Sequence, residues 1–455
     1  MSDKFLRSAV LPEFHITGGK GWINDPNGLV VFNGEYHAFF QYYPHGVEWG
    51  PMHWGHVKSK DLTHWERLPI ALSPDDAEDG CFSGSAIVWK DKLWLLYTSY
   101  RENGGGENIR QLQSLASSDD GVHFVKHGVV IGEKDLPDEY SPSDFRDPRI
   151  LRRDDKFYAL AAAKRRGGTG RILLFESDDL FKWKYVCELL HRDCKGIMTE
   201  CPDYCDAIGL LTYCEQSRSS EGHEHVNLHT TVARVGKLDY KNGFIETGRG
   251  EPVDYGFDFY APQTFTGCPI MIGWMNMWER NNPSAKYGFA GMLTVPRKVE
   301  IKNDRLWQTP VYACREALSI ENSGKITDRL IFGSVKINMT GLRAFKMKLR
   351  MKGRRYAQLT LDEGYWVFDR SNAGERIVGA EQDDDSKAQV RYMPYEKSVF
   401  NRLEIVVDRF SVEIFADGRA LSSVIYPELD ADGLELELDA DSFTYRRFDI
   451  ANRYA

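Results

Sequence analysis

The chain has 455 residues and a net charge of −9, and it contains no run rich in Lys or Arg, which argues against nucleic acid or an anionic membrane surface as a partner. No stretch approaches the roughly 20 apolar residues that a membrane-spanning helix needs. The first residues contain no apolar run of signal-peptide length, so we expect a cytoplasmic protein. The length predicts two domains, or one large domain with an appendage.

Residues 22–28, with the sequence Trp-Ile-Asn-Asp-Pro-Asn-Gly, are the first marked element. Asp-Pro-Asn-Gly is typical of a turn, because proline fixes φ and glycine allows a positive φ. The apolar residues 29–32 predict a strand after it. One interpretation is a tight loop at a sheet edge. The other is a site that aims Asp25 at a sugar, with Trp22 as an apolar wall and Asn24 as a hydrogen-bonding group.

Three similar segments follow, at residues 59–65, 118–124 and 177–183. Each begins with Ser, carries Asp two residues later and ends in an aromatic residue. The Asp positions 61, 120 and 179 are 59 residues apart (120 − 61 and 179 − 120). A fixed period of this size predicts a repeat architecture. We interpret the segments as β-turns capped by the Asp side chain, with the aromatic residue packed between repeats, and assign them no chemistry.

A polar turn that leads into an aromatic-rich strand recurs out of phase with these segments, at residues 33–42, 90–97 and 154–160, with weaker copies at 207–211 and 269–274. Together these make five units between about residue 15 and residue 305. Units of this length, built of strands and turns, predict an all-β fold that begins with a five-bladed β-propeller. In a propeller the inner strands surround one cavity, where residues far apart in the sequence can meet.

After about residue 325 the pattern changes to alternation of apolar and polar residues, as in residues 345–350 and 434–439. Strands of this kind have one face in a core and one in water, and residues 412–418 predict a hairpin. We therefore expect residues 1–310 to form the propeller, residues 311–325 a linker and residues 326–455 a β-sandwich. The sandwich could bind polysaccharide, pack structurally or mediate a homodimer.

Two further acidic residues stand in settings that suit chemistry. Asp147 follows Arg146, which is expected to lower the pKa of Asp147 and keep it ionised. Glu200 lies in an apolar setting beside a proline, where desolvation raises the pKa of a carboxyl group, as a general acid needs. The alternatives are a surface ion pair and a strand-end Glu. Together with Asp25, however, these residues lie on three different repeat units.

The blocks 22–28, 146–148 and 200–202 resemble three signature blocks of glycoside hydrolase family 32, the family of invertases, inulinases, levanases and sucrose-6-phosphate hydrolases. Further blocks agree in order, at residues 40–44, 54–56, 82–85, 259–263, 273–276 and 412–415. The resemblance implies a five-bladed propeller followed by a sandwich. It also implies a retaining β-fructofuranosidase that acts on sucrose or short fructooligosaccharides, and it implies no cofactor and no metal.

The resemblance implies roles for single residues. Asp25 would be the nucleophile that forms a fructosyl-enzyme ester, Glu200 the general acid and then base, and Asp147 the stabiliser of the transition state. The substrate-binding residues would be Asn24, Gln41, Trp49, Trp54, Phe82, Ser83, Arg146 and Trp274.

Two departures leave the substrate open. Many family members carry Trp directly before the acid Glu, where this chain has Thr199, and residues 217–225 fit the family poorly. A sucrose-6-phosphate hydrolase would need a basic pocket, for which the candidates are Arg218, His223, His225 and Lys286. A fructosyltransferase and a catalytically dead sugar-binding protein are further alternatives. Inverting five-bladed arabinanases rank low, because they lack the block around Asp25.

The eight cysteines give no sign of a metal site. None forms a CxxC pair, and no His lies at metal-ligand spacing from Cys201 and Cys205. We expect reduced and mostly buried thiols.

Overall fold

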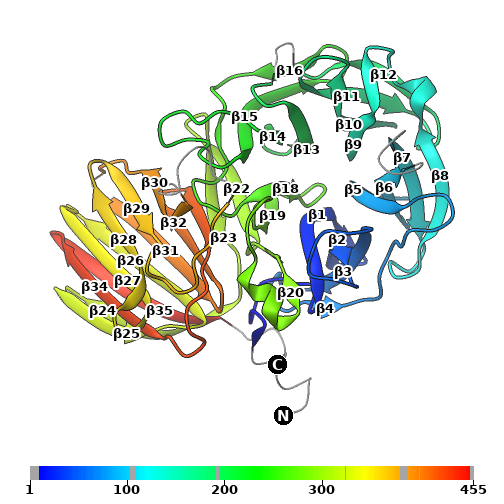
Figure 1. Ribbon diagram of the computed structural model, residues 1–455. Coiled ribbons are helices and arrows are strands. Elements are labelled where there is room, and N and C mark those ends of the chain that lie inside the picture. The colour runs from blue at the N-terminus through cyan, green and yellow to red at the C-terminus, as the bar shows by residue number, and fades with distance from the viewer. Residues whose placement is uncertain are drawn as a thin grey trace.

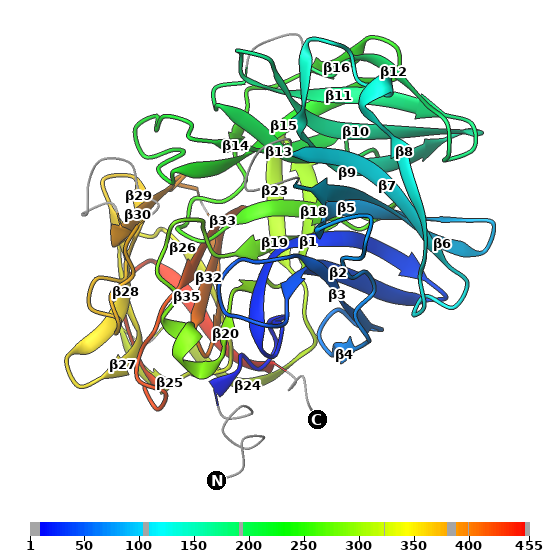
Figure 2. The ribbon, with the colours of Figure 1, turned by 45° about the vertical axis from the view of Figure 1, so that its right-hand side comes forward.

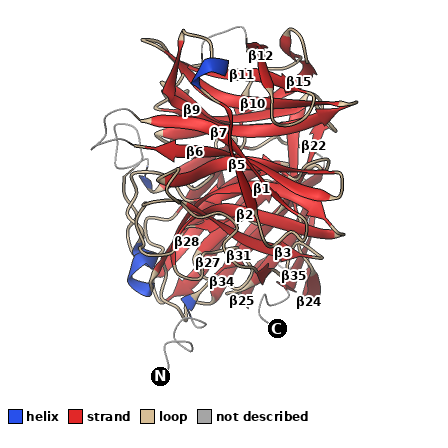
Figure 3. Cartoon of the chain, turned by 90° about the vertical axis from the view of Figure 1, so that its right-hand side faces the viewer, coloured by secondary structure: helices blue, strands red, loops and turns tan. Residues whose placement is uncertain are grey.

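The computed structural model describes residues 10–102, 109–190, 194–322, 324–379, 388–398 and 400–450. Their strands form seven antiparallel or mixed sheets, joined by turns and two short 3-10 helices, η1 (Glu133–Asp135) and η2 (Pro283–Tyr287) (Figure 3). None of the described helices is long and apolar enough to cross a membrane. Five sheets fan around a common centre and two stack beside them (Figure 1), so the predicted five-bladed propeller followed by a β-sandwich is confirmed.

Each blade runs outward from an inner strand. Blade 1 contains β1 (Gly21–Phe32), β2 (Glu35–Tyr43), β3 (His53–Ser59) and β4 (Glu66–Arg67), and blade 2 contains β5 (Gly80–Trp89), β6 (Lys92–Arg101), β7 (Arg110–Ser118) and β8 (Val125–Ile131). Blade 3 contains β9 (Tyr140–Arg153), β10 (Lys156–Arg165), β11 (Gly170–Ser177) and β12 (Trp183–Glu188), and blade 4 contains β13 (Met198–Cys205), β14 (Leu210–Gln216), β15 (His229–Asp239), β16 (Gly243–Glu246) and β17 (Glu251–Pro252). Blade 5 contains β18 (Tyr260–Thr264), β19 (Ile270–Met275), β21 (Met292–Leu293), β22 (Arg297–Lys302) and β23 (Arg305–Pro310).

The inner strands β1, β5, β9, β13 and β18 contact one another in sequence around the centre, and β18 contacts β1 to complete the ring (Figure 2). The segment β20 (Phe289–Ala290) crosses from blade 5 and pairs in parallel with the start of β1. The first and last blades are therefore joined by backbone hydrogen bonds as well as by packing.

The repeated turns have the structure that the sequence predicts. In each, the Asp side chain accepts hydrogen bonds from two backbone N–H groups, as Asp61 does from Thr63 and His64 at 2.9 and 2.8 Å. The copies at Asp120 and Asp179 repeat the pattern. Each turn joins the third strand of a blade to the fourth, which explains the constant period.

The sandwich consists of two six-stranded sheets. One contains β24 (Cys314–Glu321), β35 (Ser442–Ile450), β26 (Gly333–Thr340), β31 (Phe400–Asp408), β32 (Ser411–Ala416) and β33 (Arg419–Val424); the other contains β25 (Lys325–Arg329), β34 (Gly433–Asp439), β27 (Ala344–Lys352), β28 (Arg355–Asp362), β29 (Tyr365–Asp369) and β30 (Val390–Pro394). Their inner faces enclose one apolar core. The sequence places residues 314–321 in the predicted linker, whereas in the structure they form the edge strand β24, whose side chains are largely exposed. We propose that the sandwich begins there.

Buried ion pairs join the two parts. His15, just before β1, contacts Asp408 through Nδ1 at 2.8 Å and Glu413 through Nε2 at 2.9 Å. Arg297 of blade 5 donates to the other oxygen of Glu413 at 2.7 Å and to Asp254 at 2.9 Å. All of these side chains are buried. Buried charges persist only when they are paired, so the sandwich and the propeller depend on each other for these contacts.

This cluster predicts a loss of stability in mild alkali. Burial lowers the pKa of His15, but the hydrogen bonds and charges of Asp408 and Glu413 outweigh it and raise the pKa to about 9. In the unfolded chain the pKa is about 6.5. Protonated His15 therefore contributes about 3 kcal/mol to the free energy of unfolding. This contribution is fully present below pH 6.5 and is lost as the pH rises through about 9. Chemical denaturation between pH 6 and pH 10 measures it.

His15→Gln should flatten that pH dependence, because glutamine cannot take up the proton. His123→Gln is the matched control, since His123 is an exposed histidine beside one carboxylate, and it should keep the wild-type profile. An unchanged profile in His15→Gln would contradict the assignment.

Candidate active site

A pocket of about 570 Å³ opens at the centre of the propeller. All three predicted catalytic carboxyl groups line it: Asp25 from β1, Asp147 from β9 and Glu200 from β13. Six of the eight predicted substrate-binding residues line it as well, namely Asn24, Gln41, Trp49, Phe82, Ser83 and Arg146. The structure therefore brings together residues from four blades that are up to 176 positions apart in the chain.

Irregularities in the inner strands position these side chains. In β1, the two residues Asn24 and Asp25 oppose the single residue Gln41 of β2. The same two-against-one bulge occurs in β9 at 147–148, in β13 at 201–202 and in β18 at 261–262, and β5 has one extra residue, Ser83. A bulge bends the strand and re-aims a side chain. Asp147 and Cys201 accordingly have positive φ values of 59° and 47°.

Trp54 and Trp274, the other two predicted substrate-binding residues, are not among the described residues that line the pocket. Trp54 lies on β3, is fully buried and donates from Nε1 to the carbonyl of Phe82 at 3.0 Å. Trp274 lies on β19 and packs against Trp22 and Trp278 with ring centroids 5.8 and 5.0 Å apart. Both come from strands that lie behind the inner ring, so they support the pocket residues from behind.

The candidate basic pocket does not form either. Arg218 pairs with Glu215 at 2.8 Å, and Lys286 pairs with Glu375 of the sandwich. His223 stacks on Tyr392 at 4.0 Å, and the buried His225 contacts Thr230 at 2.8 Å. Residues 217–225 thus reach from the pocket wall to the sandwich, and none of these four side chains lines the pocket.

Asp25 is held by one of its oxygens only. Ser83 Oγ donates to Oδ2 at 2.7 Å and the thiol of Cys201 lies 3.5 Å from the same atom. Among the described residues Oδ1 has no hydrogen-bond partner, although it is buried. Burial raises the pKa of Asp25, the charge of Glu200 adds to the rise, and the hydrogen bond from Ser83 opposes it. One oxygen of Asp25 is therefore oriented and the other is available.

Glu200 is held at both oxygens. Arg146 donates to Oε1 from Nη2 at 2.8 Å and from Nε at 3.1 Å, and the hydroxyl of Tyr260 donates to Oε2 at 2.6 Å. Burial raises the pKa of Glu200, but the charge of Arg146 and these hydrogen bonds outweigh it and hold the pKa below its usual value. This is opposite to the rise that the apolar sequence context predicts.

Arg146 therefore forms its hydrogen bonds with Glu200 and not with Asp147, the next residue in the sequence. Its Nε lies 4.0 Å from Asp147. Burial raises the pKa of Asp147 to about 7; Arg146 opposes this rise, and the charges of Glu200 and Asp25 add to it. Arg146 thus lowers the pKa of Asp147, as the sequence predicts, but burial and the charges of the other two carboxyl groups outweigh this effect. Because the three carboxyl groups interact, their protons belong to the cluster rather than to one residue.

The sequence motifs assign no role to several residues that line the pocket or contact its carboxyl groups. Tyr260 lies directly before the bulge of β18, as Glu200 does in β13, and Pro262 follows as Pro202 does there, so the repeated X-Pro pattern was a usable signal. His229, Trp278 and Glu279 form the outer wall, with His229 Nε2 3.2 Å from Glu279 Oε2. They come from a strand start and a loop, with no motif to mark them. Within the described residues, no three His, Cys, Asp or Glu side chains are grouped as metal ligands would be.

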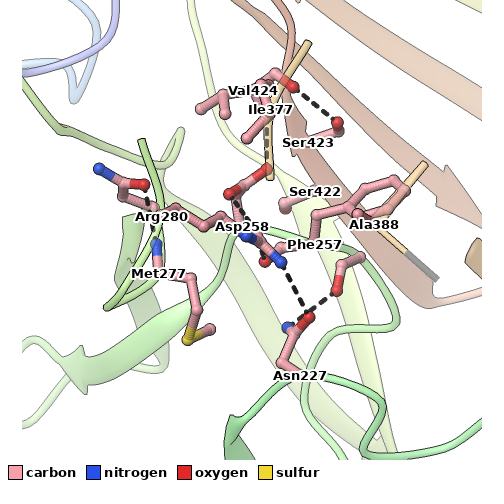
Figure 4. Close-up of polar contacts among 12 residues, drawn as sticks. Asn227, Phe257, Asp258, Met277, Arg280, Ile377, Ala388, Ser422, Ser423 and Val424 are labelled. Carbon is pink, nitrogen blue, oxygen red and sulfur yellow. Dashed lines mark hydrogen bonds and ion pairs between the residues drawn. The ribbon is translucent and has the colours of Figure 1, made fainter. Parts of the chain in front are cut away.

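The outer wall is anchored to the sandwich directly behind Glu279. Arg280 forms an ion pair with Asp258 and donates to the side chain of Asn227 at 3.3 Å (Figure 4). The second oxygen of Asp258 accepts from the backbone of Val424 at 2.8 Å and from Arg370 at 2.9 Å, both of the sandwich. Each of these charged side chains is buried.

A propeller pocket with several carboxyl groups and an aromatic rim is typical of enzymes that cleave glycosidic bonds. The family models for the N-terminal and C-terminal domains of glycosyl hydrolases family 32 match residues 15–310 and 320–452. A sucrose-6-phosphate hydrolase of Zymomonas mobilis is 34% identical over 94% of this chain and 89% of its own length.

Two solved structures are similar over 99% of this chain. A sucrose-6-phosphate hydrolase from Lactobacillus gasseri is 25% identical with a TM-score of 0.88 and 96% of its chain covered. A β-fructofuranosidase of Bombyx mori is 29% identical with a TM-score of 0.84 and 97% covered. The chain belongs to glycoside hydrolase family 32 and is a glycoside hydrolase.

The anchor predicts a large stability effect at Asp258. Asp258→Asn leaves the buried Arg280 and Arg370 without their shared carboxylate, which should lower the free energy of unfolding by about 3–5 kcal/mol. Thermal and chemical denaturation measure it. Glu437→Gln, which removes an exposed partner of Lys325, is the control and should have no measurable effect. Equal effects of the two variants would contradict the role of the anchor.

Proposed function

We propose that the chain is a retaining β-fructofuranosidase that releases fructose from sucrose or short fructooligosaccharides. The observation that carries the proposal is that Asp25 and Glu200 line the same pocket, and that Oδ1 of Asp25 has no hydrogen-bond partner among the described residues. A nucleophile and an acid on opposite sides of the scissile bond are what retaining hydrolysis requires.

In the first step Oδ1 of Asp25 attacks the anomeric carbon of the fructosyl unit. The bond to the leaving oxygen breaks, and that oxygen takes a proton from Glu200. In the second step Glu200 removes a proton from water, the water oxygen bonds to the anomeric carbon, and the ester to Asp25 breaks. Ser83 and Cys201 orient the nucleophile throughout, and Asp147 accepts hydrogen bonds from the ring hydroxyls of the substrate.

The proton of the cluster must lie on Glu200 when the bond breaks. In the free pocket, burial raises the pKa of Asp147 to about 7, while Arg146 and Tyr260 hold the pKa of Glu200 low. Hydroxyl groups of the substrate that donate to Asp147 favour its ionised form, and an ether oxygen beside Glu200 favours the protonated acid. Substrate binding thus transfers the proton to the residue that must donate it.

We also propose a cytoplasmic location. None of the eight cysteines, all of which lie in the described part of the chain, forms a disulfide, and Cys314 is exposed. Free thiols persist in reducing compartments.

Replacing the nucleophile tests the assignment. Asp25→Asn should lower fructose release from sucrose by about 10⁴-fold or more, because the amide cannot form the ester. Circular dichroism should show an intact fold, and sucrose should still bind. NMR of the wild-type reaction should detect the β-anomer of fructose first. Near wild-type turnover by Asp25→Asn, or initial release of the α-anomer, would exclude the proposed mechanism. Kestose-type products in excess of free fructose at high sucrose would indicate a transferase.

Tyr260→Phe tests the acid. It removes a hydrogen bond that favours ionised Glu200, so the pKa of Glu200 should rise and the acid should stay protonated to higher pH. The basic limb of the bell-shaped profile of kcat/KM should therefore move up by about one pH unit. Tyr445→Phe, which removes a hydroxyl bonded to Asp328 in the sandwich, is the control. A basic limb that stays in place in Tyr260→Phe would argue against Glu200 as the acid.

A further inference from the structure

The pocket has a closed floor and an open outer part. The floor holds Asp25 and Asp147, which are 8% and 7% exposed. The outer part holds Asp144 and Glu279, whose side chains are 36% and 58% exposed, together with Trp278. If the floor takes the fructosyl unit, the leaving group occupies the outer part, and its charge must suit those residues.

The pocket as a whole is acidic, and two of its carboxyl groups, those of Asp144 and Glu279, lie in the outer part. The described lining residues include five carboxyl groups: Asp25, Asp144, Asp147, Glu200 and Glu279. The only arginine among them, Arg146, is already bonded to Glu200, and none of them is a lysine. Even with one proton retained by the cluster, the pocket is strongly negative. Phosphate sites in proteins instead offer arginine, lysine or converging backbone N–H groups.

His229 is the hydrogen-bonding partner of Glu279 in this wall. The backbone N–H of Ser217 donates to Nδ1 at 3.2 Å, so the proton of the ring lies on Nε2, which faces Glu279 at 3.2 Å. The pair thus presents one N–H donor and one carboxylate acceptor, a combination that suits sugar hydroxyl groups.

Glu279 has limited freedom to move away from a charged ligand. Its backbone has a positive φ of 58°, which is uncommon for a residue other than glycine. The next residue, Arg280, is held by Asp258 and by the carbonyl of Phe257 (Figure 4). A β-carbon on Gly379 would lie 2.1 Å from the carbonyl oxygen of Glu279, so the sandwich packs closely against this turn.

The adjoining hollow holds two arginines. It shares Ser143 with the pocket and contains Arg110 and Arg166. Arg110 forms an ion pair with Glu133, and Arg166 donates to the carbonyl of Asp138 at 3.0 Å.

We propose that the outer part of this pocket selects an uncharged, hydroxyl-rich leaving group and rejects one that carries a phosphate. Glu279, with His229 as its donor partner, is the residue that determines this specificity. The inference rests on the proposed β-fructofuranosidase activity and narrows its substrate to unphosphorylated β-fructosides, although the similar proteins carry names of both kinds.

The test compares kcat/KM for sucrose and for sucrose 6-phosphate by release of free fructose. Wild type should favour sucrose by about tenfold or more, because a dianion placed near Glu279 is repelled. Glu279→Lys should lower the ratio of kcat/KM for sucrose to that for sucrose 6-phosphate by about tenfold, mainly by lowering KM for the ester. Glu279→Gln should lower this ratio less. Raising NaCl from about 20 to about 200 mM should raise kcat/KM for the ester but not for sucrose, because salt screens the repulsion.

Arg110→Gln is the control for the adjoining hollow and should leave the ratio unchanged. Equal or better use of the ester by wild type would overturn the inference. The inference would also be overturned if neither salt nor Glu279→Lys changed the ratio of kcat/KM for the two substrates. Loss of ester hydrolysis in Arg110→Gln alone would overturn it as well. In each of these outcomes sucrose is still hydrolysed, so the proposed function stands. Release from neither substrate would instead refute the proposed function itself.

Discussion

The pocket depends on a β-bulge or similar irregularity that occurs in each of the five inner strands. Each inner strand gains extra residues at the level of the central cavity. Four of these irregularities coincide with a proline, at 26, 148, 202 and 262, which has no N–H to give to the ladder. In blade 2 the position is taken by Gly84, where a β-carbon would lie 2.2 Å from the carbonyl oxygen of Leu96. A regular strand would alternate its side chains between the two faces of the blade; the bulge turns polar side chains toward the axis instead.

That arrangement creates an electrostatic problem. Asp25, Asp147 and Glu200 lie in one largely dry pocket, where like charges repel and desolvation disfavours ionisation. The single arginine is placed on Glu200, and burial raises the pKa of both aspartates. The resting pocket therefore keeps its proton away from the residue proposed to donate it. In the proposed mechanism, substrate hydroxyl groups that donate to Asp147 favour its ionised form, which couples binding to correct placement of the proton.

Local chemistry explains what could be predicted from the sequence. The Ser-x-Asp turns recur because each is closed by its own side chains, so their spacing reports the length of a blade. The blocks around Asp25, Asp147 and Glu200 are marked by proline for the same local reason. Long-range neighbours could not be predicted. Arg146 is adjacent to Asp147 in the chain, yet its guanidinium bonds to Glu200, 54 positions away. Trp54 and Trp274 have the residue type expected at a sugar site, but they lie on strands behind the inner ring. His229 and Glu279 meet only because the start of β15 lies beside the loop that follows β19.

The same long-range contacts suggest why the propeller carries a sandwich. The outer wall of the pocket is made of a loop and a strand start, which have little support of their own. Residues 217–228 and 278–280 both lead from that wall to the sandwich, through the stack of His223 on Tyr392 and through Asn227, which accepts hydrogen bonds from Arg280 and Arg391. The three arginines 280, 370 and 391 surround the ring of Phe257 at 3.8–5.9 Å. Buried charge of this density is stable only while both parts remain docked. The floor of the pocket is thus a product of the propeller alone, whereas the wall that meets the leaving group is held jointly with the sandwich.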